Sequence, residues 1–253
     1  MTHQPSPITQ TTALARALGD TPESTISVHL LARGLGRGYA VGRPASFAAA
    51  LVQEIADPRE PVGFGADADA LWSILRALPG WECVSVPSAV APRLGRLVEA
   101  ERGRPVRYYG DVYHRLDRPA AAFSHALVRQ LGRGDAALLD AAPAELRPRG
   151  WEGSARLLAE GIAAAAVVDQ AVVAIAFTSA RTVGHADIAV ATLEPWRGRG
   201  LATAAASLVA ARIQAEGQTP VWSTGEGNLA SLRIAEKIGF VEVGRRTFVI
   251  PAR

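Results

Sequence analysis

Cysteine and lysine are almost absent from this sequence of 253 residues. The single cysteine, Cys83, excludes a disulfide framework within the chain and a cysteine-based metal site. It lies in a β-like run, Trp81 to Val86, where we expect a buried and inert thiol. Any chemistry must therefore be carried by other side chains or by the backbone, and we expect no metal.

Long uninterrupted apolar segments are also missing. The longest, Ile162 to Phe177, is broken by Asp169-Gln170, so we expect no transmembrane helix. We expect instead a hairpin of two strands, Ile162 to Val168 and Ala171 to Phe177, joined by a tight polar turn at Asp169-Gln170. The N-terminus, MTHQPSPITQTT, lacks the charged start and apolar centre of a signal peptide. These features predict a cytoplasmic protein with no membrane partner.

Charge of one sign does not dominate. The chain has 27 basic and 24 acidic residues, for a net charge of +3, and Lys237 is the only lysine. The arginines are scattered and do not cluster as a nucleic-acid footprint would require. We attribute the arginine and alanine content to a bacterial-like genome composition, and the sequence argues against a nucleic-acid partner.

What the sequence does contain is a globular balance, with 49% apolar and 20% charged residues. Its length suits one large domain or two smaller ones, and either buries a sizeable core. Within this chain, one stretch is typical of a strand, a glycine loop and a helix. It reads DIAVATLEPWRGRGLATAAASLVAARIQAE, from Asp187 to Glu216.

The glycine loop predicts an anion site. Gly198 and Gly200 stand at the start of the predicted helix, where they let backbone N–H groups approach an anion closely. The helix dipole adds attraction, and Arg197 and Arg199 add full charges. The physical interpretation is a cradle for a pyrophosphate.

The spacing of the glycines and charged residues distinguishes the motifs that could form such a cradle. A Walker loop requires a lysine after its second glycine, and Lys237 is far away. A dinucleotide fingerprint requires an acid at the end of the next strand, whereas Glu216 precedes that strand. The pattern that fits is Arg-x-x-Gly-x-Ala, at Arg197, Gly200 and Ala202. It resembles the acetyl-CoA signature of the GNAT superfamily of N-acetyltransferases.

The following residues strengthen this resemblance. Gly217 ends the helix, a β-prone run follows from Thr219 to Thr224, and a second helix from Leu229 to Ile238 is closed by Gly239. We expect a hairpin from Phe240 onward. The tail motifs resemble one GNAT branch, in which a degenerate N-terminal half precedes the catalytic half; they are Pro220-x-Trp222, Asn228-x-x-Ser231, Ala235-x-Lys237 and Gly239-Phe240.

The resemblance implies an α/β (α+β) fold of two GNAT-like domains. Each would have a mixed, mostly antiparallel central sheet flanked by helices, splayed in the C-terminal domain at the coenzyme-binding strand. We place the degenerate domain at residues 1–118 and the acetyl-CoA-binding catalytic domain at 119–253, with the seam at Asp117-Arg118-Pro119. The front half has Asp67 and Asp69 where the back half has two arginines, and carboxylates would repel a pyrophosphate.

By resemblance, the coenzyme site follows the central strand and its loop. The strand end would offer a backbone N–H to the acetyl oxygen, and Asn228 would hydrogen-bond the pantetheine arm or cap its helix. The residues implied in coenzyme binding are Ala191, Thr192, Leu193, Glu194, Arg197, Gly198, Arg199, Gly200, Leu201, Ala202, Thr203, Asn228 and Ser231.

Acetyl transfer also requires a base for the amine and an acid for the departing thiolate. Candidates for the base are Asp187, which we favour slightly, His185, Glu194 and Glu226. Many GNAT members carry a tyrosine acid seven residues after the asparagine, but that position here is Ala235. Ser231 or water could supply the proton instead.

Three functions remain open at this point. The first is an N-acetyltransferase that moves an acetyl group directly, in a ternary complex, from acetyl-CoA to a small-molecule or protein amine. The second is an acetyl-CoA sensor without turnover, and the third an RNA amine acetylase supported only by the sequence pI of about 9.5. The chain would act as a monomer or homodimer, and the acceptor cannot be read from the sequence.

Overall fold

The computed structural model describes residue 9 and residues 11–252. Most of the N-terminal sequence considered above for a signal peptide lies outside them. The described residues form two compact units: one runs up to Val112 and includes the residues from Gly244 onward, and the other runs from Tyr113 to Val243. Among the residues described, no helix combines the length and apolarity needed to cross a membrane.

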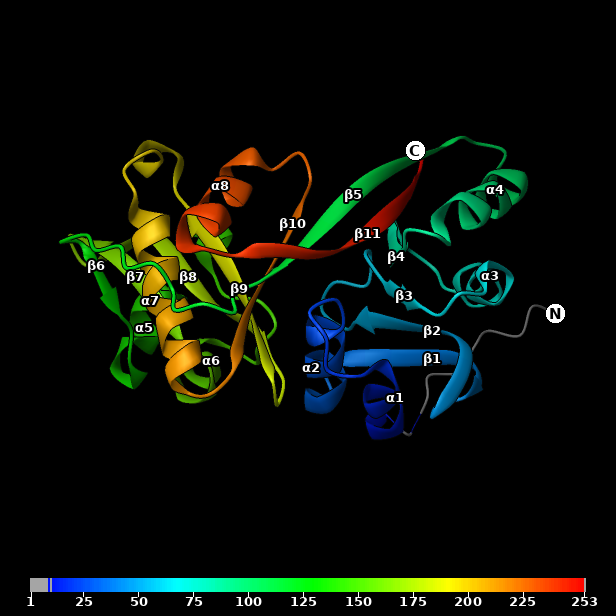
Figure 1. Cartoon of the computed structure of the whole chain (residues 1–253), viewed down its shortest axis with the longest axis horizontal. Coiled ribbons are helices and arrows are strands. Elements are labelled where there is room, and N and C mark those ends of the chain that lie inside the picture. Colours follow the sequence, from blue (N-terminus) through cyan, green and yellow to red (C-terminus); the bar gives the residue numbers. More distant parts are fainter. Residues whose placement is uncertain (1–8, 10, 253) are drawn as a thin grey trace. The chain divides into compact units, whose positions relative to one another are not determined.

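The first unit is a sheet in the order β1-β2-β3-β4-β11-β5 with two pairs of helices (Figure 1). Its neighbouring pairs β1–β2, β2–β3 and β4–β11 are antiparallel, whereas β3 and β4 are parallel. The elements are α1 (Thr11–Leu18), α2 (Thr25–Arg33), β1 (Gly36–Arg43), β2 (Ser46–Glu54), β3 (Val62–Phe64), α3 (Ala68–Leu75), β4 (Val84–Pro87), α4 (Ala91–Arg102), β5 (Val106–Arg115) and β11 (Val241–Pro251).

Strand alternation gives this sheet two buried faces. Along β2, Ala49 and Leu51 join the core beneath α3 and α4, whereas Ala50 and Val52 join the core beneath α1 and α2. Helix α3 ends at Leu75, where the indole of buried Trp81 donates to the Leu75 carbonyl at 3.0 Å.

The second unit has the strand order β5-β10-β9-β8-β7-β6. Neighbours from β6 to β9 are antiparallel, whereas β9 and β10 are parallel. The elements are β6 (Val128–Gln130), η1 (Arg133–Asp135), α5 (Ala136–Asp140), η2 (Ala144–Leu146), α6 (Ser154–Glu160), β7 (Ala163–Val168), β8 (Ala171–Arg181), β9 (His185–Thr192), η3 (Glu194–Trp196), α7 (Leu201–Ala215), β10 (Thr219–Gly225) and α8 (Leu229–Ile238).

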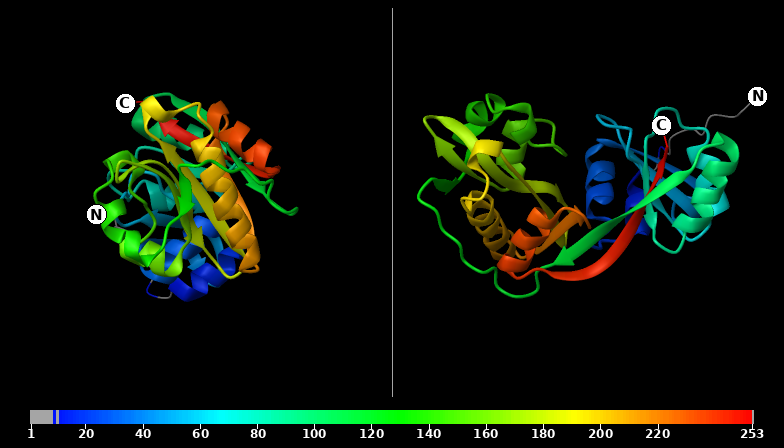
Figure 2. Two further views of the ribbon diagram at one scale, coloured as in Figure 1. Left: turned by 90° about the vertical axis from the view of Figure 1, so that its left-hand side faces the viewer. Right: turned by 90° about the horizontal axis from the view of Figure 1, so that it is seen from above.

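Small side chains bring α7 close to this sheet. Ala205 and Ala210 on α7 are fully buried in one cluster with Ala164 of β7 and Ala176 of β8. Helices α5 and α6 lie against the opposite face from α7 (Figure 2). The sheet of the second unit is therefore covered on both sides, with α7 and α8 packed on one face.

The hairpin predicted from the break in the apolar run is confirmed. β7 pairs antiparallel with β8, and Val168 opposes Ala171 across the turn. Asp169 and Gln170 both have positive φ, at 48° and 63°, as a tight two-residue turn of this kind requires.

The hairpin predicted after Phe240 is wrong, because β11 is one continuous strand from Val241 to Pro251. Gly244 does not adopt a positive φ and so makes no turn. Arg246 is 5% exposed, and its guanidinium donates to the Ser85 hydroxyl at 3.1 Å and to the Gly63 carbonyl. The buried side chain keeps the backbone extended at this point.

The predicted seam lies on an ordered segment. The Gln214 side chain on α7 accepts from Ala120 N–H at 3.0 Å and donates to the Arg118 carbonyl at 2.7 Å. Ser207, two turns earlier, donates to the Ala121 carbonyl at 2.7 Å. This segment is bound along α7, and the limits of the compact units fall within β5 and β11 instead. Separate domains at 1–118 and 119–253 stay a prediction.

Candidate functional site

The parallel strands β9 and β10 separate soon after they meet. Their register covers only His185 to Asp187 of β9 and Thr219 to Val221 of β10. Beyond this point β9 continues beside β8 as far as Thr192. A cavity of about 730 Å³ lies at this far end of β9. The carboxyl end of a parallel strand is where α/β sheets commonly bind ligands.

The cavity is lined by four parts of the second unit: the end of β9, the glycine loop with the first turn of α7, the helix α8, and η2. Of the residues predicted to bind the coenzyme, only Leu193 and Glu194 do not line it. The lining residues are Glu145, Leu146, Val190, Ala191, Thr192, Trp196, Arg197, Gly198, Arg199, Gly200, Leu201, Ala202, Thr203, Asn228, Ala230, Ser231, Arg233, Ile234 and Lys237.

The glycine loop presents backbone donors to this cavity. Gly198 and Gly200 have φ of 76° and 78°, a region in which side chains are strained, and Gly200 caps α7. The first amide bonded within the helix is that of Ala204, which donates to the Gly200 carbonyl at 3.0 Å. The amides of residues 201–203 therefore have no partner in their own helix, and donors at a helix start are suited to binding an anion.

The loop arginines are held at the rim by their neighbours. Arg197 Nε donates to the Thr192 carbonyl at 3.2 Å. Arg199 donates to the Pro195 carbonyl at 3.1 Å, and its guanidinium carbon lies 4.6 Å from the centre of the Trp196 ring. These contacts keep both positive charges beside the anion site.

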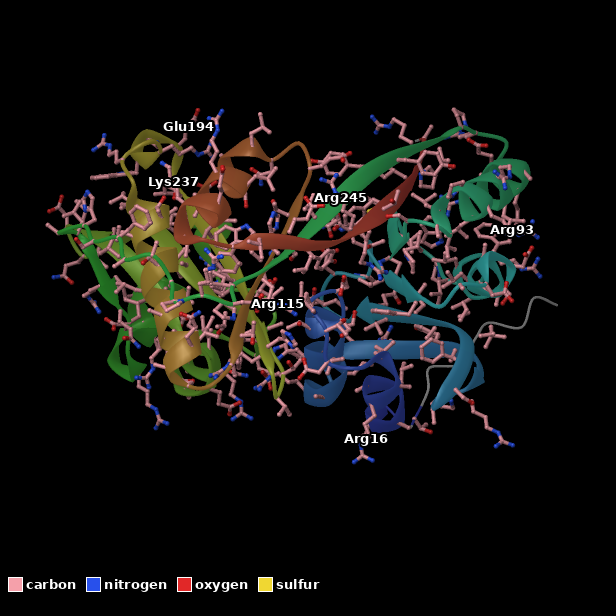
Figure 3. The ribbon with its side chains drawn as sticks, in the orientation of Figure 1. Arg16, Arg93, Arg115, Glu194, Lys237 and Arg245 are labelled. Carbon is pink, nitrogen blue, oxygen red and sulfur yellow. The ribbon has the colours of Figure 1, made fainter. Side chains whose placement is uncertain are left out.

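Helix α8 adds two more cations to the cavity lining, Arg233 and Lys237. They are four residues apart and so share one face of the helix. Lys237, the only lysine of the chain, is labelled on α8 in Figure 3. This side of the cavity is strongly attractive to phosphate groups.

The end of β9 has an open hydrogen-bonding edge. Leu193 donates its amide to the Val173 carbonyl on β8 at 3.0 Å, and the antiparallel alternation directs Ala191 to the same side. Thr192 faces the other way, and its carbonyl accordingly accepts from Arg197. Of the three strand-end residues predicted to offer an amide, Thr192 is therefore the one turned away from β8.

The first turn of α8 orders Asn228 and Ser231. The Asn228 side-chain oxygen accepts from Ser231 N–H at 3.2 Å, which confirms the predicted helix cap. The Ser231 hydroxyl oxygen accepts from the Trp222 indole N–H at 2.9 Å and lines the cavity. Ala235, where a tyrosine would be expected, is fully buried in the core and supplies no proton donor.

Asp187 lies away from the cavity lining, because it is 4% exposed at the closed end of the splay. One carboxylate oxygen accepts from the Ser179 hydroxyl at 2.5 Å and the other from the Ser223 hydroxyl at 3.2 Å. His185, at the start of β9, donates its amide to the Thr182 hydroxyl at 3.0 Å. The structure does not bring these two candidate bases to the glycine loop.

The other predicted acids also lie outside the lining. Glu226 is exposed in the turn before α8, and Glu194 is exposed on η3, where Figure 3 labels it. The acid that does line the cavity, Glu145, was not among the sequence candidates. It belongs to no motif, and only the neighbouring apolar Leu146 marks the segment as one that packs on the core.

A second cavity, of about 980 Å³, lies in the first unit and mixes charges of both signs. Arg102 packs its guanidinium 4.0 Å from the centre of the Trp81 ring, and Glu60 and Glu82 lie beside the half-buried Cys83. Burial and the nearby acids raise the pKa of the Cys83 thiol to about 12, so it stays protonated and unreactive. Among the described residues, no cluster of three or more histidine, cysteine or acidic side chains suits a metal ion.

Comparison with known proteins agrees with this geometry. A family model described as GNAT acetyltransferase matches residues 133–247, whereas no curated protein matches the chain by sequence. A GCN5-related N-acetyltransferase-like protein from Streptococcus suis is 20% identical with a TM-score of 0.70, and the match covers 96% of this chain and 98% of that one.

Two further solved structures have the same fold along most of their length. A GCN5-related N-acetyltransferase from Kribbella flavida is 17% identical with a TM-score of 0.61, and 95% of this chain and 96% of that chain are covered. A tandem GNAT protein from the clavulanic acid biosynthesis pathway is 13% identical with a TM-score of 0.54, covering 94% and 92%. The chain thus has the fold of these GNAT proteins, and its residues 133–247 match the GNAT acetyltransferase family model.

Proposed function

We propose that the protein is an N-acetyltransferase that transfers an acetyl group directly from acetyl-CoA to an amine. The observation that carries the proposal is the cavity at the end of β9, in which unpaired helix amides, two left-handed glycines and four cationic side chains converge. A linked pair of phosphates fits this combination of dipole and charge. The family match at residues 133–247 supports the same activity.

The residues around the cavity suit each demand of the reaction. The α7 amides and Arg197 would hold the pyrophosphate, and the adjoining β9 edge would receive the thioester. The amide of Thr192 would donate to the thioester oxygen as negative charge develops on it, an interaction worth a few kcal/mol in such sites. Asn228 and Ser231, at the start of α8, would border the sulfur-bearing arm.

The transfer itself forms one bond and breaks one. The neutral amine nitrogen attacks the thioester carbonyl carbon, a C–N bond forms, the C–S bond breaks, and the thiolate leaves. The nitrogen gives up a proton and the thiolate accepts one. Ser231 can donate that proton, because its oxygen already accepts from Trp222 and its own hydrogen is available. Water would remove the proton from the amine and pass it to Asp187 or Glu226, because both acids lie outside the cavity lining.

We propose that the first unit does not bind the coenzyme. Asp67 caps α3 by accepting from the amides of Asp69 and Ala70, both at 3.0 Å. Asp69 in turn pairs at 2.6 Å with Arg93 of α4, which is labelled in Figure 3. The Asp67 carboxylate occupies two helix amides and brings negative charge, in contrast to the open amides of α7. The similarity to a tandem GNAT protein supports a second, degenerate GNAT-like half.

Coenzyme binding is tested with two matched glycine substitutions at opposite ends of α7. Gly200 and Gly217 have φ of 78° and 79°, and an added Cβ meets no atom within 4 Å at either position. Gly200→Ala and Gly217→Ala should therefore cost similar stability, about 1 kcal/mol. Calorimetry should show that Gly200→Ala weakens CoA binding about tenfold while Gly217→Ala leaves it unchanged.

Turnover is tested by following release of the CoA thiol from acetyl-CoA across a set of amines. Release that depends on an added amine is the expected result. Binding of CoA without release would favour an acetyl-CoA sensor instead. A wild-type protein with no affinity for CoA, or equal loss of affinity in the two glycine variants, would rule out this site.

A further inference from the structure

The charges that line the cavity are divided by position. Arg197 and Arg199 come from the glycine loop, and Arg233 and Lys237 from α8. Among the residues that the structure describes, Glu145 of η2 is the only acidic side chain in the lining. The four cations attract a phosphate-bearing ligand, whereas the Glu145 carboxylate repels it. Glu145 therefore has no role in binding that ligand.

Glu145 and the basic side chains approach the cavity from different faces of the sheet. The core that contains α5, α6 and Leu146 of η2 also includes Ala191 of β9, whereas α7 packs on the other face with Ile188. The cavity lining includes both groups of elements. The cavity therefore extends around the end of β9 from one face of the sheet to the other. The basic side chains lie on the side of α7 and α8, and Glu145 lies on the opposite side.

The position of Glu145 is determined by its neighbour. Leu146 is 1% exposed, and its amide donates to the Pro143 carbonyl at 2.9 Å, which closes the single turn of η2. This turn packs against β8 and β9. Glu145 itself is exposed, and among the described residues none forms a hydrogen bond or ion pair with its carboxylate. The anchored turn thus presents an uncompensated negative charge to the cavity.

We infer that Glu145 recognises the acceptor by binding an ammonium group, so that the protein selects amines of positive charge. This inference rests on the proposed function. A carboxylate at the side opposite the phosphate cradle attracts a cation to the place where an acceptor must approach the thioester. The same carboxylate repels an acceptor that carries its own carboxylate, which gives discrimination by charge rather than by shape.

Three amines of matched chain length test the inference: diaminobutane, butylamine and aminobutyrate. Glu145→Gln should raise the KM for diaminobutane about tenfold with a smaller change in kcat, because the interaction is made on binding. The KM for aminobutyrate should stay the same or fall. Asp140→Asn, which removes another exposed acid, on α5 and outside the cavity, should change none of these values.

Calorimetry separates failure of this inference from failure of the proposed function. If the proposed function holds, wild type and Glu145→Gln bind CoA equally, because the carboxylate lies away from the phosphate cradle. Diaminobutane binding to the CoA-loaded protein should then weaken about tenfold in Glu145→Gln, with or without turnover. Equal affinities in the two proteins, or equal KM changes for all three amines, would overturn the role of Glu145. So would a wild-type protein that prefers aminobutyrate or binds none of the amines.

Discussion

At the scale of single residues, several acidic side chains have structural roles that cannot be read from the residue type alone. Asp67, interpreted as a repulsive charge in a loop, is the N-cap of α3. Asp187, favoured as a general base, is 4% exposed and bonded to two serine hydroxyls. Glu145, which belongs to no motif, lines the cavity. Burial and hydrogen bonding therefore divide the acids into structural and accessible groups.

Asp135 is expected to stabilise the start of the family-matched region in a pH-dependent way. Its carboxylate accepts from Arg129 at 2.6 Å and 2.9 Å and from Gly132 N–H at 2.8 Å, and these bonds lower the pKa of Asp135 to about 2. A lowered pKa means that the stabilisation is present above about pH 4, the pKa of an unfolded aspartate, and is lost as the pH falls toward 2.

Asp135→Asn should therefore lower the free energy of unfolding by about 1 kcal/mol at pH 7. Urea titrations at pH 7 and at progressively lower pH should show the difference from wild type shrinking below about pH 4. Asp140→Asn, at an exposed position on α5, is the control and should be nearly neutral. A difference that does not change with pH would contradict the role of the ionised carboxylate.

At the scale of elements, the strand, glycine loop and helix from β9 to α7 form the centre of the site. Positive φ at Gly198 and Gly200 turns the chain from η3 into α7. The alanines of α7 permit close packing on β7 and β8, which holds the helix N-terminus beside the end of β9. Close packing of small side chains thus positions the donors of the anion site.

This packing predicts that Ala205 tolerates no larger side chain. It is 0% exposed in the core between α7 and the sheet, so Ala205→Leu should lower the free energy of unfolding by about 1–3 kcal/mol. Ala211→Leu, on the exposed side of the same helix, adds the same atoms where there is space and should cost little. Urea denaturation of both variants measures the contrast, and equal losses would show that α7 does not depend on close contact.

At the scale of the whole molecule, the chain returns to its first unit at the end. Residues from Gly244 onward belong with the described residues up to Val112, and β11 pairs with β4 there. Val249 is fully buried in the core beneath α3 and α4. The last strand of the first unit therefore follows the whole second unit in the chain.

Deletion of residues 244–253 should destabilise the first unit. β4 would lose its antiparallel partner, and the core would lose Val249. Hydrogen exchange should accelerate by tenfold or more, roughly, at the amides of Val84 to Val86, while those of Ala163 to Val168 in β7 keep their protection. Unchanged exchange in β4 would show that the first unit is complete without the last strand.

Local patterns in the sequence were enough to identify the second half of the fold. The helix from Leu201, the turn at Asp169-Gln170 and the cap at Asn228 each depend on residues within a few positions, and all three are confirmed. A degenerate GNAT-like front half stays a prediction. The glycine loop was singled out because glycine and helix-start chemistry are local.

The residues that line the cavity opposite the glycine loop are placed there by contacts between segments distant in the sequence. Glu145 reaches the cavity because η2 packs on β8 and β9, and no spacing in the chain encodes that contact. The continuity of β11 likewise depends on Arg246, which bonds to Ser85 and Gly63 far away in the sequence. The amino-acid sequence by itself determined the glycine loop, the helix that follows it and the tight turn at Asp169-Gln170, because these depend on neighbouring residues. Only the tertiary structure decided which acids face the cavity and where the last strand pairs, because burial is a property of the folded chain.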